Sequence, residues 1–201
     1  MVIAGGGPTG VEVSGMFAEL RKQVILEEYP ELKEVKAKIY LVNSGDHLLK
    51  SMSEKSQKFV YKKLSSTYVD VLLNKRVKDF NGREVLLNDG SSIKSRNLIW
   101  ATGVKGRVFE GLPEDWYEAG NRLLVNEYHK LQQADHIYAI GDGSIMFSDK
   151  NFPEGHPRLA QVAIQQGRNL AKNLIAVEKG SIIKAFQYKD KGAMAVIGKS
   201  N

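Results

Sequence analysis

The chain of 201 residues is 42% hydrophobic, which is enough for one large domain or two small ones with a buried core. Its 29 Lys and Arg residues are scattered among 23 Asp and Glu residues, a pattern that favours a solvated surface over nucleic-acid binding and leaves a basic face toward anionic lipid open. The chain has no cysteine, so disulfides, thiolate metal sites and CxxC redox chemistry are excluded within it.

The first third of the chain alternates predicted strands and helices. Strands are expected over residues 1–5, 38–42 and 69–73, and amphipathic helices over residues 8–27 and 53–64. This β-α-β-α-β order predicts a parallel sheet with right-handed crossovers.

A change of pattern follows this alternation. Two turn signals, Asn81-Gly82 and Asp89-Gly90, separate short apolar segments and predict an antiparallel meander. The apolar run over residues 97–103 is expected to return to the sheet and to end in a glycine turn at Gly103. Residues 1–104 are therefore expected to form one nucleotide-binding domain.

The remainder of the chain predicts a second α/β region. The run IYAIGD at residues 137–142 is interpreted as a buried strand, and residues 158–178 as a long helix. Two short strands are expected within residues 185–198, around Asp190-Lys191-Gly192. No run of about 18 apolar residues indicates a transmembrane helix.

The glycine run after the first strand is the strongest functional signal. Gly5, Gly7 and Gly10 fit the G-x-G-x-x-G pattern between a strand and a helix. The first glycine permits a tight turn, the second a close approach to a pyrophosphate, and the third helix–strand packing. Free N–H groups at the helix start favour the phosphates. A purely structural glycine turn is the alternative.

A dinucleotide site also needs a group for the adenosine ribose. Counting about twenty residues from the motif leads to Glu27, Glu28 and Glu31, which lie in a polar linker and are interpreted as solvated. The end of the second strand holds Asn43, which can bond a ribose hydroxyl but cannot repel a 2′-phosphate by charge. The preference for NADH over NADPH is therefore weakened, although no arginine follows to favour NADPH.

Five further residues have both functional and structural interpretations. Glu12, expected in the first turn of the helix, stabilises the helix dipole or lies beside a bound nicotinamide, and the residues alone favour neither. Gly141-Asp142, at the end of an apolar run, predicts a turn. Gln161 and Gln165 share one helical face beside small alanines, which leave room for a flat ligand, and an exposed polar stripe is the alternative. The histidines lack metal-ligand spacing, so no metal site is predicted.

Taken in order, these segments resemble the type II NADH:quinone oxidoreductases, within the two-dinucleotide-binding-domain flavoproteins of the pyridine nucleotide-disulfide oxidoreductase superfamily. The resemblance rests on GGGPTGVE (5–12), IWATGV (99–104), IYAIGD (137–142), AQVAIQQGRNLAKNL (160–174) and DKGAMAVIGK (190–199). The last two runs are the more specific ones. Asn43 departs from the glutamate that is usual in the family.

The resemblance implies a role for each candidate residue. Glu12 would lie near the nicotinamide and the flavin, as a proton relay or by tuning the site. Gly141 and Asp142 would face FAD, and Gln161 and Gln165 would border the quinone pocket. The residues implied for NAD are Gly5, Gly7, Pro8, Thr9, Gly10, Asn43 and Gly103.

The resemblance also implies the organisation of the chain. Residues 1–104 would be the NAD(H)-binding domain, a Rossmann-like sheet with a meander. Residues 105–201 would be the C-terminal part of a divided FAD-binding domain, whose N-terminal part and membrane-anchoring tail are expected to lie outside this sequence. The segment by itself is expected to bind mainly NAD(H), without retaining FAD.

The whole protein would transfer a hydride from NADH to FAD and then electrons to a quinone. Its implied partners are the quinone and the membrane surface on the cytoplasmic side, and a homo-oligomer is expected. The alternatives are another FAD- and NAD(P)-dependent reductase of the superfamily, such as a ferredoxin or disulfide reductase, and a nucleotide-binding module without turnover.

Overall fold

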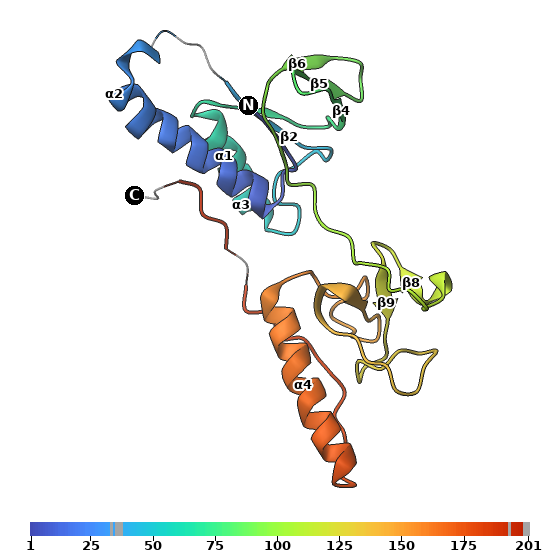
Figure 1. The fold of residues 1–201 in the computed structure, drawn as a ribbon. Helices are drawn as coiled ribbons and strands as arrows, with labels where there is room; N and C mark the ends of the chain where they lie inside the picture. Colours follow the sequence, from blue (N-terminus) through green and yellow to red (C-terminus); the bar gives the residue numbers. More distant parts are fainter. Residues whose placement is uncertain (33, 35–37, 193, 199–201) are drawn as a thin grey trace. The chain divides into compact units, whose positions relative to one another are not determined.

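The computed structural model describes residues 1–32, 34, 38–192 and 194–198 (Figure 1). The chain forms two compact units, one of residues 1–103 together with 194–198 and one of residues 104–192. The division expected from the sequence places residues 194–198 with the second domain, whereas Ala195 and Ile197 pack against the core of the first unit. Residues 199–201 of the expected second domain lie outside the described residues.

A four-stranded parallel sheet forms the centre of the first unit. Its strands are β1 (Val2–Ala4), β2 (Ile39–Val42), β3 (Val69–Leu72) and β7 (Leu98–Trp100), in the order β3-β2-β1-β7. Every pairing is parallel. The predicted strands and their parallel arrangement are therefore confirmed.

One face of this sheet is covered by helices. Helix α1 (Pro8–Leu20) continues through a π-helical turn (Arg21–Ile25) into α2 (Leu26–Glu28), and a 3-10 turn follows (Pro30–Leu32). Helix α3 (Glu54–Ser65) completes the layer. The buried side chains on this face come from alternate strand positions and from both long helices: Ile3, Ile39, Leu41, Val69, Val11, Ala18, Val60 and Leu64.

The opposite face of the sheet is covered by the meander. Strands β4 (Val77–Phe80), β5 (Glu84–Leu87) and β6 (Ser92–Lys94) pair antiparallel, as predicted. Their buried side chains pack with the residues of the parallel strands that point away from the helices. This cluster consists of Val77, Val85 and Leu87 from the meander and Val2, Ala4 and Val42 from the parallel sheet. A sheet buried on both faces explains why the central strands β1 and β2 are continuously apolar.

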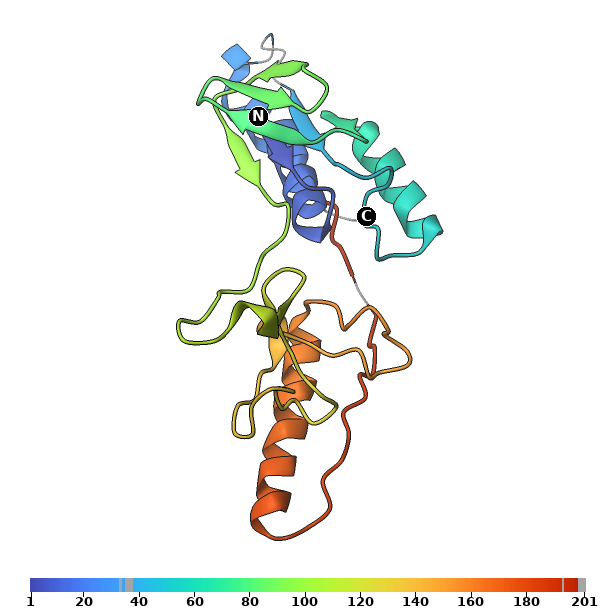
Figure 2. The same cartoon turned by 90° about the vertical axis from the view of Figure 1, so that its right-hand side faces the viewer.

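The second unit has little regular sheet. Strands β8 (Tyr117–Glu118) and β9 (Arg122–Leu124) form an antiparallel hairpin, and β10 (Ser144–Ile145) pairs parallel with β9. The long helix α4 (Ala160–Glu178) confirms the helix predicted over residues 158–178, and the chain then runs back alongside it (Figure 2). No helix in the described ranges is long and apolar enough to cross a bilayer.

Two predicted strand regions of this unit are wrong. Residues 137–140 are not a buried strand: a single bridge from Lys130 to Tyr138 is the pairing within the described chain. Ile137, Tyr138 and Ile140 are 37–39% exposed, and the backbone bonds of this run within the described chain go to residues 129–131. Residues 185–192 and 194–198 are extended without forming strands, and the expected second strand includes residue 193, which lies outside the described residues.

Candidate functional site

The glycine-rich loop joins β1 to α1 at the carboxyl edge of the parallel sheet. Gly5 has a φ of +110°, and a Cβ built there would overlap the carbonyl oxygen of Ala101, which follows β7. A Cβ on Gly10 would in turn overlap the carbonyl oxygen of Gly5. These two glycines are thus required by close backbone packing, which holds the loop against the end of β7.

Gly7 differs from its neighbours in the loop. It is the N-cap of α1 with an ordinary φ of −76°, and no side chain in the described part of the chain caps the helix. A Cβ at Gly7 would find no described heavy atom within 4 Å. The loop therefore leaves open space beside the uncapped start of a helix, which is the geometry that receives a phosphate.

Asn43 lies at the end of β2 and braces this loop. Its Oδ1 accepts a hydrogen bond from the Gly6 N–H at 3.0 Å. Its Nδ2 donates to the carbonyl oxygens of Gly45 and His47 at 3.1 and 2.9 Å. Asn43 lies at the end of the second strand, as predicted, and its contacts with the loop are visible only in the tertiary structure. One lone pair of Oδ1 is left for a ribose hydroxyl.

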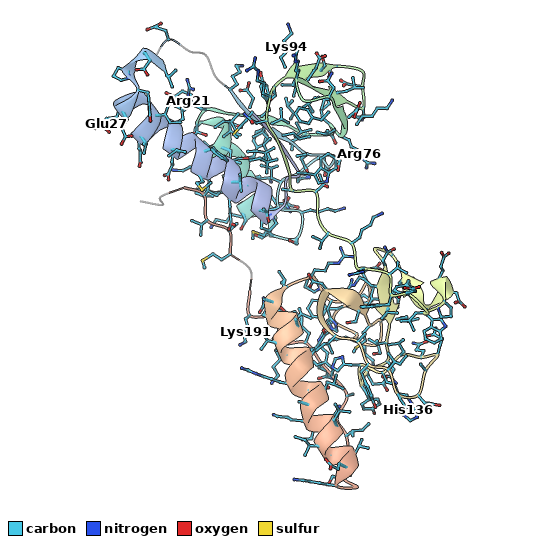
Figure 3. The ribbon with its side chains drawn as sticks, in the orientation of Figure 1. Arg21, Glu27, Arg76, Lys94, His136 and Lys191 are labelled. Atoms are coloured by element: carbon cyan, nitrogen blue, oxygen red, sulfur yellow. The ribbon has the colours of Figure 1, made fainter. Side chains whose placement is uncertain are left out.

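Other candidates lie around the same edge. Pro8 and Thr9 are exposed in the first turn of α1, and Gly103, with a φ of +106°, ends the turn after β7. By contrast, Glu27, Glu28 and Glu31 are exposed in the turns that follow α1. Figure 3 shows Glu27 at the end of this helical segment opposite to the glycine loop.

Glu12 is placed differently from the expectation. Helix α1 begins at Pro8 and has no acidic residue in its first turn, so Glu12 belongs to the second turn. The predicted helix-dipole interaction is therefore wrong, since this effect is confined to the terminal turn. The Glu12 Oε1 instead accepts a hydrogen bond from the Val196 N–H at 3.1 Å. This carboxylate holds the returning segment 194–198 on the first unit.

In the second unit, Gly141 and Asp142 form a 3-10 turn (Gly141–Gly143) before β10. Gly141 has a φ of +68°, and its N–H donates to the Oε1 of Gln166 at 2.7 Å. Asp142 is exposed at this turn. Gln166, which is 3% exposed, fixes the turn on α4 and was missed by the sequence analysis, because it lies off the face shared by Gln161 and Gln165.

Gln161 and Gln165 share one face of α4, as predicted, but they are not an exposed polar stripe. The Gln161 Nε2 donates to the carbonyl oxygen of Gly192 at 3.1 Å. The Gln165 Nε2 donates to the carbonyl oxygen of Lys189 at 3.0 Å, and its Oε1 accepts from the Lys189 N–H at 3.1 Å. Both amides therefore bind the backbone of the extended segment beside α4.

Buried ionisable groups lie under this extended segment. His156 and Asp149 are 2% and 5% exposed, and their Nε2 and Oδ2 atoms are 3.0 Å apart. Burial disfavours the charged form of Asp149, but hydrogen bonds from His156 and from the amides of Tyr188 and Asn151 outweigh it and lower its pKa. Burial lowers the pKa of His129 to about 4, and the neighbouring Asn169 opposes this shift only in part.

Comparisons with known proteins agree with this geometry. Residues 1–167 match the family model described as pyridine nucleotide-disulphide oxidoreductase. The chain is 28% identical over 198 residues to a type II NADH:quinone oxidoreductase of Haemophilus influenzae, a match that covers 96% of this chain and 44% of that protein. It is 28% identical over 209 residues to the mitochondrial internal alternative NAD(P)H-ubiquinone oxidoreductase A1 of Arabidopsis thaliana, which covers 98% of this chain and 40% of that protein.

A solved structure shares the fold. NDH2 from Plasmodium falciparum in complex with NADH matches with a TM-score of 0.82 at 20% identity, over 98% of this chain and 55% of that chain. The α/β fold class and the family resemblance predicted from the sequence are confirmed. The chain spans about two fifths of the length of the two curated relatives.

Proposed function

Because the chain belongs to the pyridine nucleotide-disulphide oxidoreductase family, we propose that its first unit binds NADH within a flavin-dependent NADH:quinone oxidoreductase. The observation that carries this proposal is the open space at Gly7, beside the uncapped start of α1. The two curated relatives described above are named as NADH or NAD(P)H oxidoreductases with a quinone acceptor.

In this proposal the loop residues hold the dinucleotide. The pyrophosphate lies over Gly7, Pro8, Thr9 and the following helix amides, and Gly5 and Gly10 keep the loop tight enough for that approach. Asn43 accepts a ribose hydroxyl through its remaining Oδ1 lone pair. Because Asn43 carries no charge, it gives no electrostatic discrimination against the 2′-phosphate of NADPH, so NADH selectivity must depend on shape.

The nicotinamide end is assigned to the other residues at the carboxyl edge of the sheet. Gly103, in a turn with a φ of +106°, leaves open space beside its backbone for the nicotinamide ring. We assign to Glu12 a position near the nicotinamide, where its carboxylate either relays a proton or orients the ring through the 194–198 segment that it holds. The supporting contact is its hydrogen bond from the Val196 N–H.

FAD fits the residues of the second unit. Asp142 presents an exposed carboxylate on a glycine turn that Gln166 fixes in place, a suitable acceptor for hydroxyls of the ribityl-phosphate part. When bound, FAD would supply the redox chemistry, accepting a hydride and releasing electrons one or two at a time. The residues of this chain bind and orient both cofactors, and Gln161 and Gln165 border the acceptor pocket.

We also propose association with other surfaces. The exposed side chains of Ile164, Leu174, Ile175 and Val177 on α4, and of Ile137 and Ile140, support contacts with a second copy or with further parts of the protein. The formal net charge of +6 supports a peripheral position on the cytoplasmic, anionic face of a membrane.

Anaerobic absorbance measurements on the protein that carries this sequence test the proposed reaction. NADH is expected to remove the visible absorbance of bound FAD, and a short-chain ubiquinone is expected to restore it. Failure of NADH to change the absorbance would contradict the hydride step. Absorbance that NADH removes and the quinone does not restore would favour another reductase of the family.

A further inference from the structure

Helix α4 carries four side-chain amides at a regular spacing. Gln161, Gln165, Asn169 and Asn173 follow one another at intervals of four residues, so they lie one above the next along a single face of the helix. The segment over residues 184–192 runs antiparallel to this face after the turn at Gly180 (Figures 1 and 2). We call these four residues the amide row.

The C-terminal half of the amide row, Asn169 and Asn173, binds Lys184. The Asn173 Oδ1 accepts from the Lys184 N–H at 3.0 Å, and its Nδ2 donates to the Lys184 carbonyl oxygen at 2.9 Å. The Asn169 Nδ2 donates to the same carbonyl oxygen at 3.2 Å, and its Oδ1 accepts from Asn173 at 3.3 Å. Both backbone groups of Lys184 are thus satisfied by side chains.

The N-terminal half of the row, Gln161 and Gln165, repeats this pattern at Lys189. Gln165 bonds both the N–H and the carbonyl oxygen of Lys189, just as Asn173 does at Lys184. Gln161 bonds the carbonyl oxygen of Gly192. A side-chain amide presents a donor and an acceptor in one plane, as a peptide group does, so the row takes the place of a neighbouring β-strand.

The other side of the segment is held by the core. Phe186 and Tyr188 are each 4% exposed and point into the second unit. The Phe186 N–H donates to the Glu127 carbonyl oxygen at 2.8 Å, and the Tyr188 N–H donates to the Asp149 Oδ2 at 3.0 Å. Beyond Tyr188, the turn at 189–192 is bonded to α4 by Gln165 and Gln161 within the described chain.

The two glutamines differ in how many of their polar atoms are hydrogen-bonded. Both polar atoms of Gln165 are engaged by one residue, whereas Gln161 uses only its Nε2, and its buried Oε1 has no partner among the described residues. Figure 3 shows Lys191 beside the first turn of α4, where the 189–192 turn ends. The Gln165 amide is therefore held at both of its polar atoms by the backbone of Lys189.

We propose that Gln165 is a positioning residue: its amide holds the backbone of Lys189 and so fixes the 189–192 turn beside the start of α4. It acts on quinone reduction through this turn. The consequence for quinone reduction rests on the proposed function, whereas the positioning of the turn does not.

Amide hydrogen exchange measured by NMR tests the positioning. Gln165→Met keeps the length of the side chain and removes both hydrogen bonds, so exchange of the Lys189 amide is expected to accelerate at least tenfold. Exchange of the Lys184 amide, held by Asn173, should change less than threefold. Gln187→Met, at an exposed position of the same segment, is the matched control and should leave Lys189 exchange unchanged.

A rescue variant and kinetics complete the test. Gln165→Glu keeps the acceptor for the Lys189 N–H, so it should restore most of the protection of the Lys189 amide. In the protein that carries this sequence, Gln165→Met should raise the KM for quinone, and Gln165→Glu should bring it most of the way back to the wild-type value. Unchanged Lys189 exchange in Gln165→Met would overturn the proposal, as would a KM that stays raised in Gln165→Glu while protection is restored. If Gln165→Met does not fold, Gln165→Asn, whose amide is too short to reach Lys189, replaces it with the same expected exchange. Absence of quinone turnover in the wild type would contradict the proposed function and leave the exchange result to decide the positioning.

Discussion

The two units of the chain satisfy their backbone groups in different ways. In the first unit, parallel and antiparallel strands bond one another, and the side chains between the layers are apolar. In the second unit, short strands are supplemented by buried polar side chains, among them Asp149, Gln166 and Asn173. Stability in the first unit should therefore respond mainly to packing, and in the second to hydrogen bonds and pH.

Trp100 and Trp116 make this comparison measurable. Trp100 belongs to β7 of the first unit, and Trp116 packs against the core of the second. They are the two tryptophans of the chain. Urea unfolding followed by fluorescence, with the other tryptophan replaced by Phe, reports on each unit separately.

The largest expected effect is in the first unit. Gly10→Val places a side chain where the carbonyl oxygen of Gly5 lies, and the helix must move away from the sheet. The free energy of unfolding reported by Trp100 should fall by roughly 4 kcal/mol. Gly7→Val is the matched control, because its Cβ meets open space; equal losses in the two variants would contradict the packing account of the loop.

Acid should act on the second unit through His129. Its pKa is about 4 in the folded state and 6.5 ordinarily, so the unfolded state binds more protons between these values. The free energy of unfolding of the second unit should therefore be highest above pH 6.5 and fall by about 3 kcal/mol as the pH is lowered to 4. Asp149, whose pKa is lowered from 3.8, adds a loss only below that range.

His129→Phe should flatten this dependence between pH 6.5 and 4 in the unfolding reported by Trp116. The first unit should change little over the same range, since the side chains between its layers are apolar. A Trp116 transition that keeps its full pH dependence in His129→Phe would assign the effect to another group.

A smaller loss is expected when Gln166 is replaced. Gln166→Leu removes the acceptor for the Gly141 N–H and should cost the second unit about 2 kcal/mol, the usual cost of a buried hydrogen-bond partner. Arg168→Leu, at an exposed position of the same helix, serves as the control. Similar unfolding free energies for the two variants would show that the turn at 141–143 is not held by this bond.

The smallest expected effect concerns the N-cap of α3. The Ser53 Oγ accepts from the Ser56 N–H at 3.3 Å, and Ser53→Ala should lower the stability of the first unit by about 1 kcal/mol. Lys58→Ala removes an exposed pair with Glu54 and should change it by less than about 0.5 kcal/mol. A larger loss in Lys58→Ala than in Ser53→Ala would reverse this ranking.

Hydrophobic periodicity predicted the first unit because that unit is organised by apolar burial. Val2 to Ala4 and Ile39 to Val42 are buried on both sides, and their runs are read directly as parallel strands. The same reasoning failed at residues 137–140, where an apolar run is paired by one bridge in the described chain and its large side chains stay partly exposed. It failed again at residues 184–192, because their partners are amides of α4, which carry no apolar pattern.

The candidate site was predictable to the extent that glycine geometry determines it. Gly5, Gly7 and Gly10 follow from the loop motif, and the position of Asn43 from the end of β2. The bond from Val196 to Glu12 could not be predicted, since 184 positions separate the two residues. The four-residue spacing of the amide row was present in the sequence as a signal, but nothing local indicates what the amides bind.

Calorimetric titration with NADH tests the central claim most directly. The wild-type chain should bind NADH, and Gly7→Val should weaken the affinity at least 100-fold, because its side chain occupies the space assigned to the pyrophosphate. The unfolding free energy reported by Trp100 should stay within about 1 kcal/mol of the wild type. Equal NADH affinity in the two proteins would contradict the assignment of the glycine loop as the dinucleotide site.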